Sequence, residues 1–265
     1  CSAGGSGDFA ATGTTIKEQL EQGRTLFGDK KTGNYYIAYF QSYTNTYAPI
    51  DYLEKLYKEA LQEDTVCGIS IATRPDCLDA DVLDLLGRLK EEYPEKFIWI
   101  ELGLQTIHED TAQYIRRGYP LSCFEEAVRQ LVKCGIPYIV HVILGLPGET
   151  PKKIYETINY LNSCRPFGIK LQLLHVLNGT DLCLDYFAGN FTTYEKEEYL
   201  DILIHCLELL SPDIVIHRLT GDGPKELLVA PRWSLHKRDV LNSLHQLMKQ
   251  RNTYQGRLFL CHKTH

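Results

Sequence analysis

Five polar segments recur along the chain, and each follows a run of apolar or aromatic residues typical of a strand. They are Gln41–Thr46, Thr73–Asp76, Glu101–Thr106, Gly145–Glu149 and the segment that ends at His175. Polar residues at the carboxyl ends of successive parallel strands build small-molecule sites in α/β barrels. Their order along the chain therefore predicts one binding site assembled from several strands.

A carboxylate, an amide and a guanidinium follow one another around the third of these segments. Glu101 and Gln105 flank Gly103, where they could bind a ribose or an amino acid. The alternative is a satisfied core pair, because a carboxylate inside a barrel needs partners. Arg117 ends the next predicted helix and could hold a ligand carboxylate in a bidentate fork. An arginine in this position is more often a surface group that complements the helix dipole.

The fourth segment combines a strand histidine with a glycine-rich turn. His141 lies within an apolar strand, where a satisfied core histidine is the commoner finding. Gly145 and Gly148 carry no side chain, so the backbone there can approach a flat ligand closely. The alternative is a plain turn that leads into the helix at Pro151. The Gln41–Thr46 stretch is rich in side chains that bond to backbone, which favours a binding loop.

The elements between these segments predict an α/β fold. Six apolar runs alternate with helical patterns, which indicates parallel strands joined by right-handed crossovers. Near-continuous apolar strands are expected where both sheet faces are buried. We expect one core domain over residues 1–219 and a small, partly helical extension over 220–265. The predicted strands are Tyr35–Phe40, Val66–Ile71, Phe97–Leu102, Tyr138–Leu144, Ile169–Val176 and Asp213–His217.

The composition excludes several classes of protein. The chain has 265 residues, 44% of them hydrophobic, which is enough for one barrel-sized core. A net charge of −6 argues against a basic nucleic-acid clamp, although local basic segments remain. No apolar run is long enough to span a bilayer, and the first residues do not resemble a signal peptide. Nine cysteines, odd in number and irregularly spaced, predict a reducing, cytoplasmic protein, with Cys67, Cys134 and Cys206 as buried thiols.

The amino-acid sequences of these segments and their order along the chain resemble the radical S-adenosylmethionine (SAM) superfamily. The nearer resemblance is to the branch that contains the Elongator catalytic subunit and the YhcC-like proteins. It is carried by Phe40–Pro49, Ser70–Asp76, Glu101–Thr106, Arg117-Gly118 and Gly145–Glu149, and by the tail phrases His217–Pro224 and Ala230–Arg238. It covers essentially the whole chain.

The resemblance implies a [4Fe–4S] cluster held by three cysteines in a loop after the first barrel strand. One iron binds SAM, and an electron from the cluster cleaves it to methionine and a 5′-deoxyadenosyl radical, which abstracts hydrogen from the substrate. Cys1 resembles the last of the three cluster ligands. The implied fold is thus a partial (βα)6 radical SAM barrel that lacks its first strand and most of the cysteine loop. We expect such a fragment to be inactive without the missing cysteines. Near the other terminus, Cys261, His262 and His265 have weak metal-site spacing, and a frayed terminus is the favoured interpretation.

The resemblance also implies roles for the polar residues nearest the amino terminus. Gln41 and Ser42 fall where relatives carry a glycine-rich turn that contacts the methionyl amino group, and this chain lacks those glycines. Ser70 falls at a ribose-binding position. Gln105 and Arg117 match the positions that contact the ribose and the methionyl carboxylate.

The remaining implied contacts lie around the fourth segment. His141 occupies a ribose-contact position, and the turn from Gly145 to Glu149, with Gly145 and Pro147 as its contact residues, matches the adenine side of the site. The implied partners are SAM and an electron donor such as flavodoxin or ferredoxin. The resemblance to the Elongator subunit suggests tRNA wobble-uridine modification. The basic segments Arg116-Arg117, Lys152-Lys153 and Arg232–Arg238 with Trp233 would be its RNA contacts, or else solvated helix starts.

Two other functions remain open from the sequence. One is a radical SAM oxidoreductase that acts on a small molecule such as a tetrapyrrole, since substrate choice depends on loops and appendages. The other is a cluster-free module that binds SAM or another nucleotide.

Overall fold

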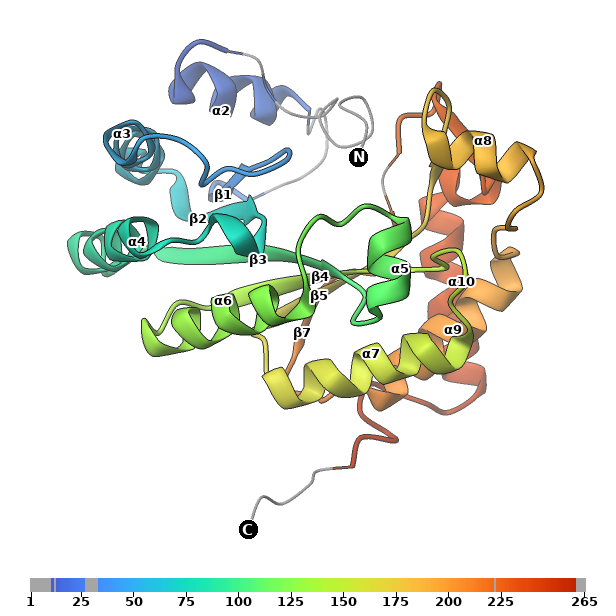
Figure 1. The fold of residues 1–265 in the computed structure, drawn as a ribbon. Helices are drawn as coiled ribbons and strands as arrows, with labels where there is room; N and C mark the ends of the chain where they lie inside the picture. The colour runs from blue at the N-terminus through green and yellow to red at the C-terminus, as the bar shows by residue number, and fades with distance from the viewer. Residues whose placement is uncertain (1–10, 12, 27–32, 222, 261–265) are drawn as a thin grey trace. The chain divides into compact units, whose positions relative to one another are not determined.

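The structure, a computed structural model, describes residues 11, 13–26, 33–221 and 223–260 (Figure 1). Six strands form one sheet in the order β1-β2-β3-β4-β5-β7, so the predicted alternation of six strands with helices is confirmed. A separate two-stranded sheet pairs β6 with β8. The strands are β1 Tyr36–Phe40, β2 Val66–Thr73, β3 Phe97–Gln105, β4 Tyr138–Leu144, β5 Gly168–Leu173, β6 Val176–Leu177, β7 Val215–Arg218 and β8 Leu228–Ala230.

Helices follow most of the strands of the large sheet, as a chain of βα units requires. None of the described helices has the length and apolar character needed to cross a lipid bilayer. The helices are α2 Ile16–Thr25, α3 Ile50–Gln62, α4 Ala80–Glu92, α5 Glu109–Tyr114, α6 Leu121–Lys133, α7 Pro151–Cys164, α8 Asp181–Phe187, α9 Lys196–Leu209 and α10 Lys237–Gln250, with short 3₁₀ turns at Pro75–Cys77 and Arg232–Leu235.

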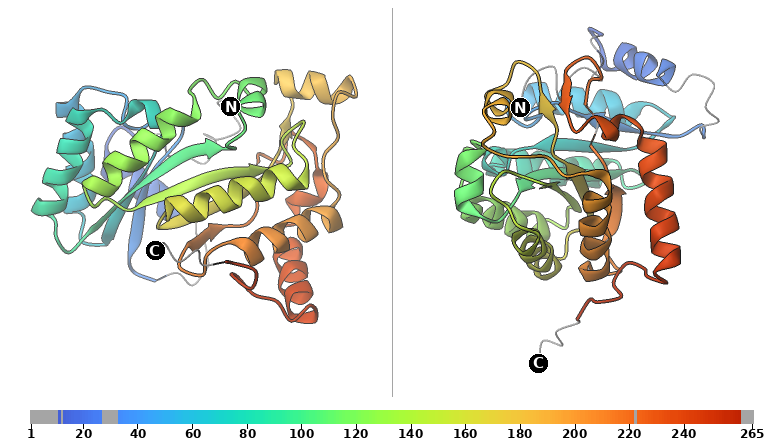
Figure 2. Two further views of the ribbon diagram at one scale, coloured as in Figure 1. Left: turned by 60° about the horizontal axis from the view of Figure 1, so that its bottom comes forward. Right: turned by 90° about the vertical axis from the view of Figure 1, so that its right-hand side faces the viewer.

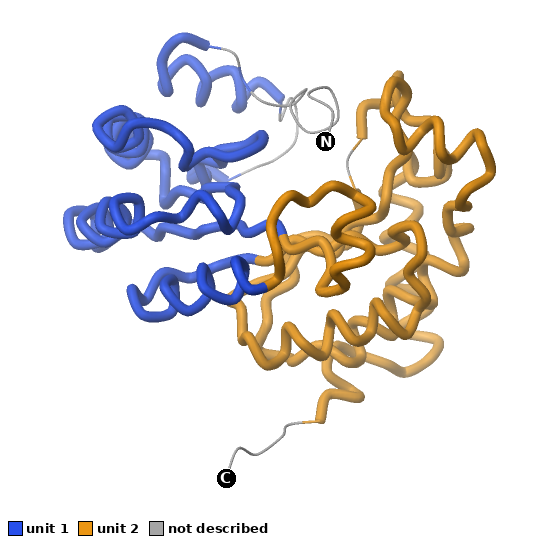
Figure 3. The backbone as a smooth tube through the Cα atoms, in the orientation of Figure 1, with its two compact units in different colours: residues 1, 3–103, 122–139 blue, residues 2, 104–121, 140–265 orange. Residues whose placement is uncertain are grey.

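The chain divides into two compact units (Figure 3). The described residues up to 103, together with 122–139, form unit 1, and residues 104–121 with those from 140 onward form unit 2. Each unit has its own buried apolar residues. The domain boundary predicted after residue 219 stays a prediction.

Unit 1 is built on parallel strands, and its central strand β2 is buried on both faces. β1 pairs with β2 and β2 with β3, with Ser70 opposite Trp99 and Ala72 opposite Glu101. Ile69 and Ile71 are fully buried on one face of β2, and Gly68 and Ser70 are buried on the other. α3 packs on β2 and on α4, and it buries Tyr57 completely. This burial on both faces explains why the strands read as apolar runs without alternation.

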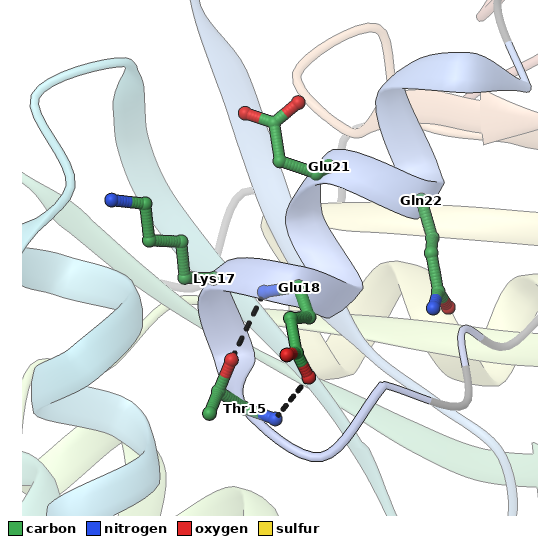
Figure 4. A pocket seen from close by; sticks show the side chains of 5 residues that line it. All are labelled: Thr15, Lys17, Glu18, Glu21 and Gln22. Carbon is green, nitrogen blue, oxygen red and sulfur yellow. Dashed lines mark hydrogen bonds between the residues drawn. The ribbon is translucent and has the colours of Figure 1, made fainter.

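A capping box begins α2 at the edge of unit 1. Thr15 accepts a hydrogen bond from the backbone N–H of Glu18, and the Glu18 carboxylate accepts one from the Thr15 N–H in return (Figure 4). Two otherwise unpaired donors of the first turn are satisfied in this way. The surface hollow beside this turn is lined by Thr15, Lys17, Glu18, Glu21 and Gln22, and none of the site residues predicted from the sequence lies in it.

Unit 2 places a layer of helices beside its strands. α7 lies against α9, and α9 lies against α10 (Figure 2). After α10 the chain returns along α9, where the backbone N–H groups of Gly256 and Leu258 donate to the carbonyls of Leu207 and Glu208 at 3.0 and 2.8 Å. The buried Glu208 carboxylate accepts hydrogen bonds from Arg257, at 3.1 Å, and from Thr253. The last described segment is therefore fastened to α9 by backbone and side chain.

Two details differ from the sequence predictions. Cys134 is exposed and Cys67 is half-buried, so only Cys206 of the three expected buried thiols is buried. The fifth strand ends at Leu173 rather than Val176.

Val176 belongs instead to the small antiparallel sheet. Leu174 leaves β5 by donating its N–H to the carbonyl of Leu144, 3.0 Å away, and Val176 pairs with Ala230. Val176, Cys183 and Ala230 then form a separate small core under α8. α8 itself was missed, although Thr180, whose hydroxyl accepts from the Cys183 N–H at 3.2 Å, is a good N-cap signal.

Candidate functional site

In unit 1 the predicted ribose-contact serine is paired with a carboxylate. The Ser70 hydroxyl donates to Oε1 of Glu101 at 2.7 Å, and both residues are buried. The two side chains lie on the neighbouring strands β2 and β3. The buried carboxylate therefore has the partner that its burial requires, although that partner is Ser70 and not the Gln105 considered from the sequence.

The loop that carries Gln41 and Ser42 is held by its own side chains. The Asn45 amide donates to the carbonyls of Ala72 and Ser42 at 2.9 and 3.2 Å. Tyr57, fully buried on α3, donates to the Asn45 carbonyl at 2.6 Å, and burial raises the pKa of its hydroxyl. These bonds fix the loop to the end of β2, and the binding role expected from its composition stays a prediction.

Thr46 adds a second anchor to the same loop. Its hydroxyl lies 2.6 Å from that of Thr73 and donates to the carbonyl of Cys77, also at 2.6 Å. Thr46 and Thr73 are both buried. Gln41 and Ser42 remain half-buried beside this network, and their predicted contact with SAM stays a prediction.

In unit 2, Gln105 ends β3 in an unusual backbone conformation. Its φ is +62°, which side chains other than glycine adopt at a cost. Its amide oxygen accepts a hydrogen bond from the Tyr119 hydroxyl at 3.3 Å. Among the described residues its amide nitrogen has no acceptor, so this N–H₂ is suited to donate to a hydroxyl of a ligand.

Arg117 is buried and holds the turn around Gln105. Its guanidinium donates to the carbonyls of Thr106, Tyr119 and Leu104 at 2.7, 2.9 and 3.3 Å, and to Glu109 at 3.1 Å. Only 2% of its side chain is exposed, which rules out the surface arginine considered from the sequence. The predicted contact with a methionyl carboxylate stays a prediction, whereas the bonds to backbone carbonyls are present in the fold itself.

His141 on β4 is oriented by a side chain of β5. The amide nitrogen of Gln172 lies 3.1 Å from Nδ1 of His141. An amide N–H₂ can only donate, so Nδ1 accepts and the proton of the neutral imidazole resides on Nε2. Gln172 was missed from the sequence; the available signal was a polar residue within an otherwise apolar strand.

The glycine turn after β4 packs under a tyrosine. Gly145 has φ +88°, and a Cβ at this position would lie 3.1 Å from the ring of Tyr194. Burial raises the pKa of Tyr194 to about 12, so its hydroxyl stays protonated at neutral pH. Gly148 has φ +80°, and a Cβ there would meet nothing within 4 Å. Pro147, between them, is half-buried.

His175, two residues after β5, is enclosed by a later glycine segment. A Cβ on Gly221 would lie 2.7 Å from Cε1 of the imidazole, and one on Gly223 would lie 2.8 Å from Nδ1. Nε2 is buried and has no hydrogen-bond partner among the described residues. Burial, aided by the nearby Lys237 charge, lowers the pKa of His175 to about 4.

The described cysteines do not form a cluster site. Seven are free thiols, and no group of three or more metal-binding side chains occurs among the described residues. Cys1, the predicted ligand, lies outside the described residues, as do Cys261, His262 and His265. The residues expected to bind SAM, in contrast, lie within the described part of the chain. The Gln105 amide, the Nε2 proton of His141 and the side-chain-free turn at Gly148 fit a nucleoside with ribose hydroxyls and a flat base.

The fold is an α/β partial barrel. The family model described as the radical SAM superfamily matches residues 9–161, and that of the radical SAM C-terminal domain matches residues 166–250. The chain therefore belongs to the radical SAM superfamily. Membership implies a [4Fe–4S] cluster and SAM as cofactors.

Curated sequences similar to this chain show to which branch of the superfamily it is related. The chain is 41% identical to the protein YtqA of Bacillus subtilis over 260 residues, which are 98% of this chain and 80% of YtqA. It is 32% identical to the protein YhcC of Escherichia coli, over 88% of this chain and 74% of YhcC. The predicted YhcC-like branch is thus confirmed.

Among solved structures, the fold is similar to that of Elp3 from the archaeon Methanocaldococcus infernus. The TM-score is 0.73 at 16% identity, and the match covers 91% of this chain and 59% of that one. At this level of identity the likeness supports the fold alone, an α/β partial barrel.

Proposed function

We propose that the chain is the core of a radical SAM enzyme in which unit 2 holds the adenosyl part of SAM. The observation that carries the proposal is the orientation of His141, whose Nδ1 accepts from Gln172 at 3.1 Å. This bond fixes the neutral tautomer with its proton on Nε2, which makes the imidazole a donor to a ribose hydroxyl oxygen. Gln105 would supply a second ribose contact.

The glycine turn would receive the adenine. Its backbone polar groups are approachable because no Cβ occupies the space beside Gly148. Gly145 and Pro147 would complete this side of the site. Arg117 would hold the backbone on either side of Gln105 in place through its bonds to the Thr106 and Leu104 carbonyls.

From unit 1, we propose that Gln41 and Ser42 contact the methionyl part of SAM and that Ser70 contacts the ribose. Cys1 is proposed as one cluster ligand. When bound, the cluster supplies the electron that cleaves SAM to methionine and a 5′-deoxyadenosyl radical. The protein's own residues bind and orient SAM and exclude water from the reacting carbon.

For the substrate we propose a uridine of tRNA. The support is the resemblance of the chain to the Elongator branch, which is an argument by analogy. The indole N–H of the half-buried Trp233 donates to the Tyr194 carbonyl at 3.0 Å, and its ring packs near Tyr199. The exposed Lys152 and Arg232 remain as phosphate contacts.

The test is an anaerobic iron–sulfur reconstitution of the full-length protein, followed by dithionite, SAM and an assay for 5′-deoxyadenosine. We expect a brown protein that releases 5′-deoxyadenosine, and we expect His141→Ala to raise the KM for SAM. A reconstituted protein that forms none would contradict the proposed radical chemistry. Filter binding of tRNA at several salt concentrations tests the substrate, since phosphate contacts give affinity that falls steeply with salt. Binding of tRNA that does not exceed that of a DNA duplex would contradict the proposed substrate.

A further inference from the structure

Two turns of unit 2 that are distant in sequence are tied together by a hydroxyl and a carboxylate. Thr106, fully buried just after Gln105, donates from its hydroxyl to Oε1 of Glu149, which ends the glycine turn. The same hydroxyl oxygen accepts the backbone N–H of His108 at 3.1 Å. The donor and acceptor capacities of Thr106 are thus both used, and its rotamer is fixed.

The Glu149 end of this tie is equally constrained. The backbone N–H of Glu149 donates to the Leu146 carbonyl at 3.0 Å, which closes the turn that contains Gly148. Burial raises the pKa of the Glu149 carboxyl, and the bond from Thr106 opposes that rise. The Glu149 side chain therefore joins the glycine turn to the segment that follows β3.

Further contacts reinforce the same junction along the first turn of α7. The ring nitrogen Nε2 of His108 lies 2.9 Å from the carbonyl of Lys153. The Lys153 ammonium pairs with Asp110 at 2.6 Å, with Asp110 largely exposed. An exposed pair of this kind contributes little, so the buried Thr106–Glu149 bond is the strong element.

We propose that Glu149 is a positioning residue that, through Thr106, locks the Gln105 turn to the Gly145–Gly148 turn. The inference rests on the proposed function, because these two turns are the ones that would contact the ribose and the adenine of SAM. Gln105 needs such support, since its φ of +62° is maintained only by its surroundings. Binding energy that would otherwise order the two turns is then available for SAM.

The first experiment measures hydrogen exchange in the cofactor-free protein, so it does not depend on the proposed function. We expect Glu149→Ala and Thr106→Val each to raise amide exchange over residues 104–108 by about fivefold to tenfold. Glu149→Gln, which keeps an acceptor oxygen, should stay within about twofold of wild type. The double variant Thr106→Val/Glu149→Ala should match the single variants, because both remove the same bond.

The second experiment measures steady-state kinetics on the reconstituted enzyme. Both disruptive variants should raise the KM for SAM by about fivefold to tenfold and leave kcat within about twofold. Two matched controls come from the same unit. Ser234→Ala removes a buried hydroxyl that donates to the Pro231 carbonyl at 2.8 Å, and Asp201→Asn alters an exposed carboxylate that pairs with Arg251. Neither control should change exchange over residues 104–108 or the KM.

The outcomes separate the two proposals. Additive effects in the double variant, or a Glu149→Gln variant as impaired as Glu149→Ala, would overturn the positioning role. A normal KM in the disruptive variants of an active enzyme would do the same. A wild-type enzyme that forms no 5′-deoxyadenosine would overturn the proposed function instead, whatever the exchange data show.

Discussion

Gln172 on β5 donates its amide N–H to Nδ1 of His141 on β4, across 3.1 Å. A side chain of one strand thus selects the tautomer of a histidine on another. The relationship resembles the way a second group fixes the tautomer of many functional histidines. Loss of the Gln172 amide should therefore change the position of the proton on the His141 ring.

We predict that Gln172→Leu raises the KM for SAM by about fivefold to tenfold, because His141 loses the bond that keeps its proton on Nε2. The variant should retain its fold, since leucine suits an apolar strand. Steady-state kinetics on the reconstituted enzyme measure this change. Gln130→Leu, at a half-exposed position of α6 whose amide bonds only to Glu126, is the control and should leave the KM unaltered. An unchanged KM in Gln172→Leu would contradict the assigned role.

Arg117→Lys should destabilise the protein by about 2–4 kcal/mol, because a lysine cannot reproduce the guanidinium fork and leaves buried carbonyls without donors. Urea unfolding measures the change. Arg116→Lys is the matched control. The Arg116 side chain is 77% exposed and, within the part of the chain that the structure describes, pairs with Asp181 alone, so we expect a change within about 0.5 kcal/mol. Equal effects of the two variants would show that the bonds of Arg117 do not stabilise the fold.

Three glycine variants should separate steric from conformational effects. Gly145→Ala and Gly148→Ala both force alanine to positive φ, at about 1 kcal/mol each. Gly145→Ala should cost about 1–2 kcal/mol more, because its Cβ would lie 3.1 Å from the Tyr194 ring. Gly87→Ala, within α4 and with nothing near its Cβ position, should instead stabilise by about 0.5–1 kcal/mol. Thermal or urea unfolding measures the stability of the three variants. A Gly148→Ala variant as unstable as Gly145→Ala would contradict the contact with Tyr194.

The stability of the protein should fall between pH 6.5 and about 4 in a manner that depends on His175. Its pKa is lowered to about 4 in the folded protein, so in this window the unfolded chain binds more protons than the folded one. Stability is then fully present above pH 6.5 and falls by roughly 3 kcal/mol as pH approaches 4. The groups identified around the imidazole are Gly221, Gly223 and the Lys237 ammonium.

His175→Gln should flatten this part of the pH profile, measured as the free energy of unfolding in urea at several pH values. His245→Gln, at an exposed position of α10, is the control and should leave the profile unchanged. A profile that keeps its slope in His175→Gln would show that other groups cause the acid sensitivity.

The sequence predicted the strands of the large sheet because their signal is local. β4 was predicted with its observed bounds, since Tyr138–Leu144 is an apolar run between a glycine-proline turn and a second glycine. β5 was predicted too long, because the apolar sequence continues through Val176 while the backbone turns away after Leu173. Only a tertiary bond, from the Leu174 N–H to the Leu144 carbonyl, decides where that strand ends.

For the site, the sequence identified residue positions but not their partners. The pairing of Ser70 with Glu101 depends on strand register, and that of Thr106 with Glu149 joins positions 43 residues apart. Neither periodicity nor spacing carries such information. The burial of Arg117 was missed for the same reason, because an arginine at a helix end reads as a surface group until the carbonyls around it are known.

The segment after α10, which is bonded to α9, determines where the protein can be shortened to a stable fragment. The C-terminal family match ends at residue 250, whereas two of the hydrogen-bond partners of Glu208 on α9, Thr253 and Arg257, lie beyond that limit. A fragment designed to stop at the match would keep the buried carboxylate and its contact with His205 but lose both of these donors. Expression trials should therefore place the cut after Leu258, which also retains the backbone pairing with the Glu208 carbonyl.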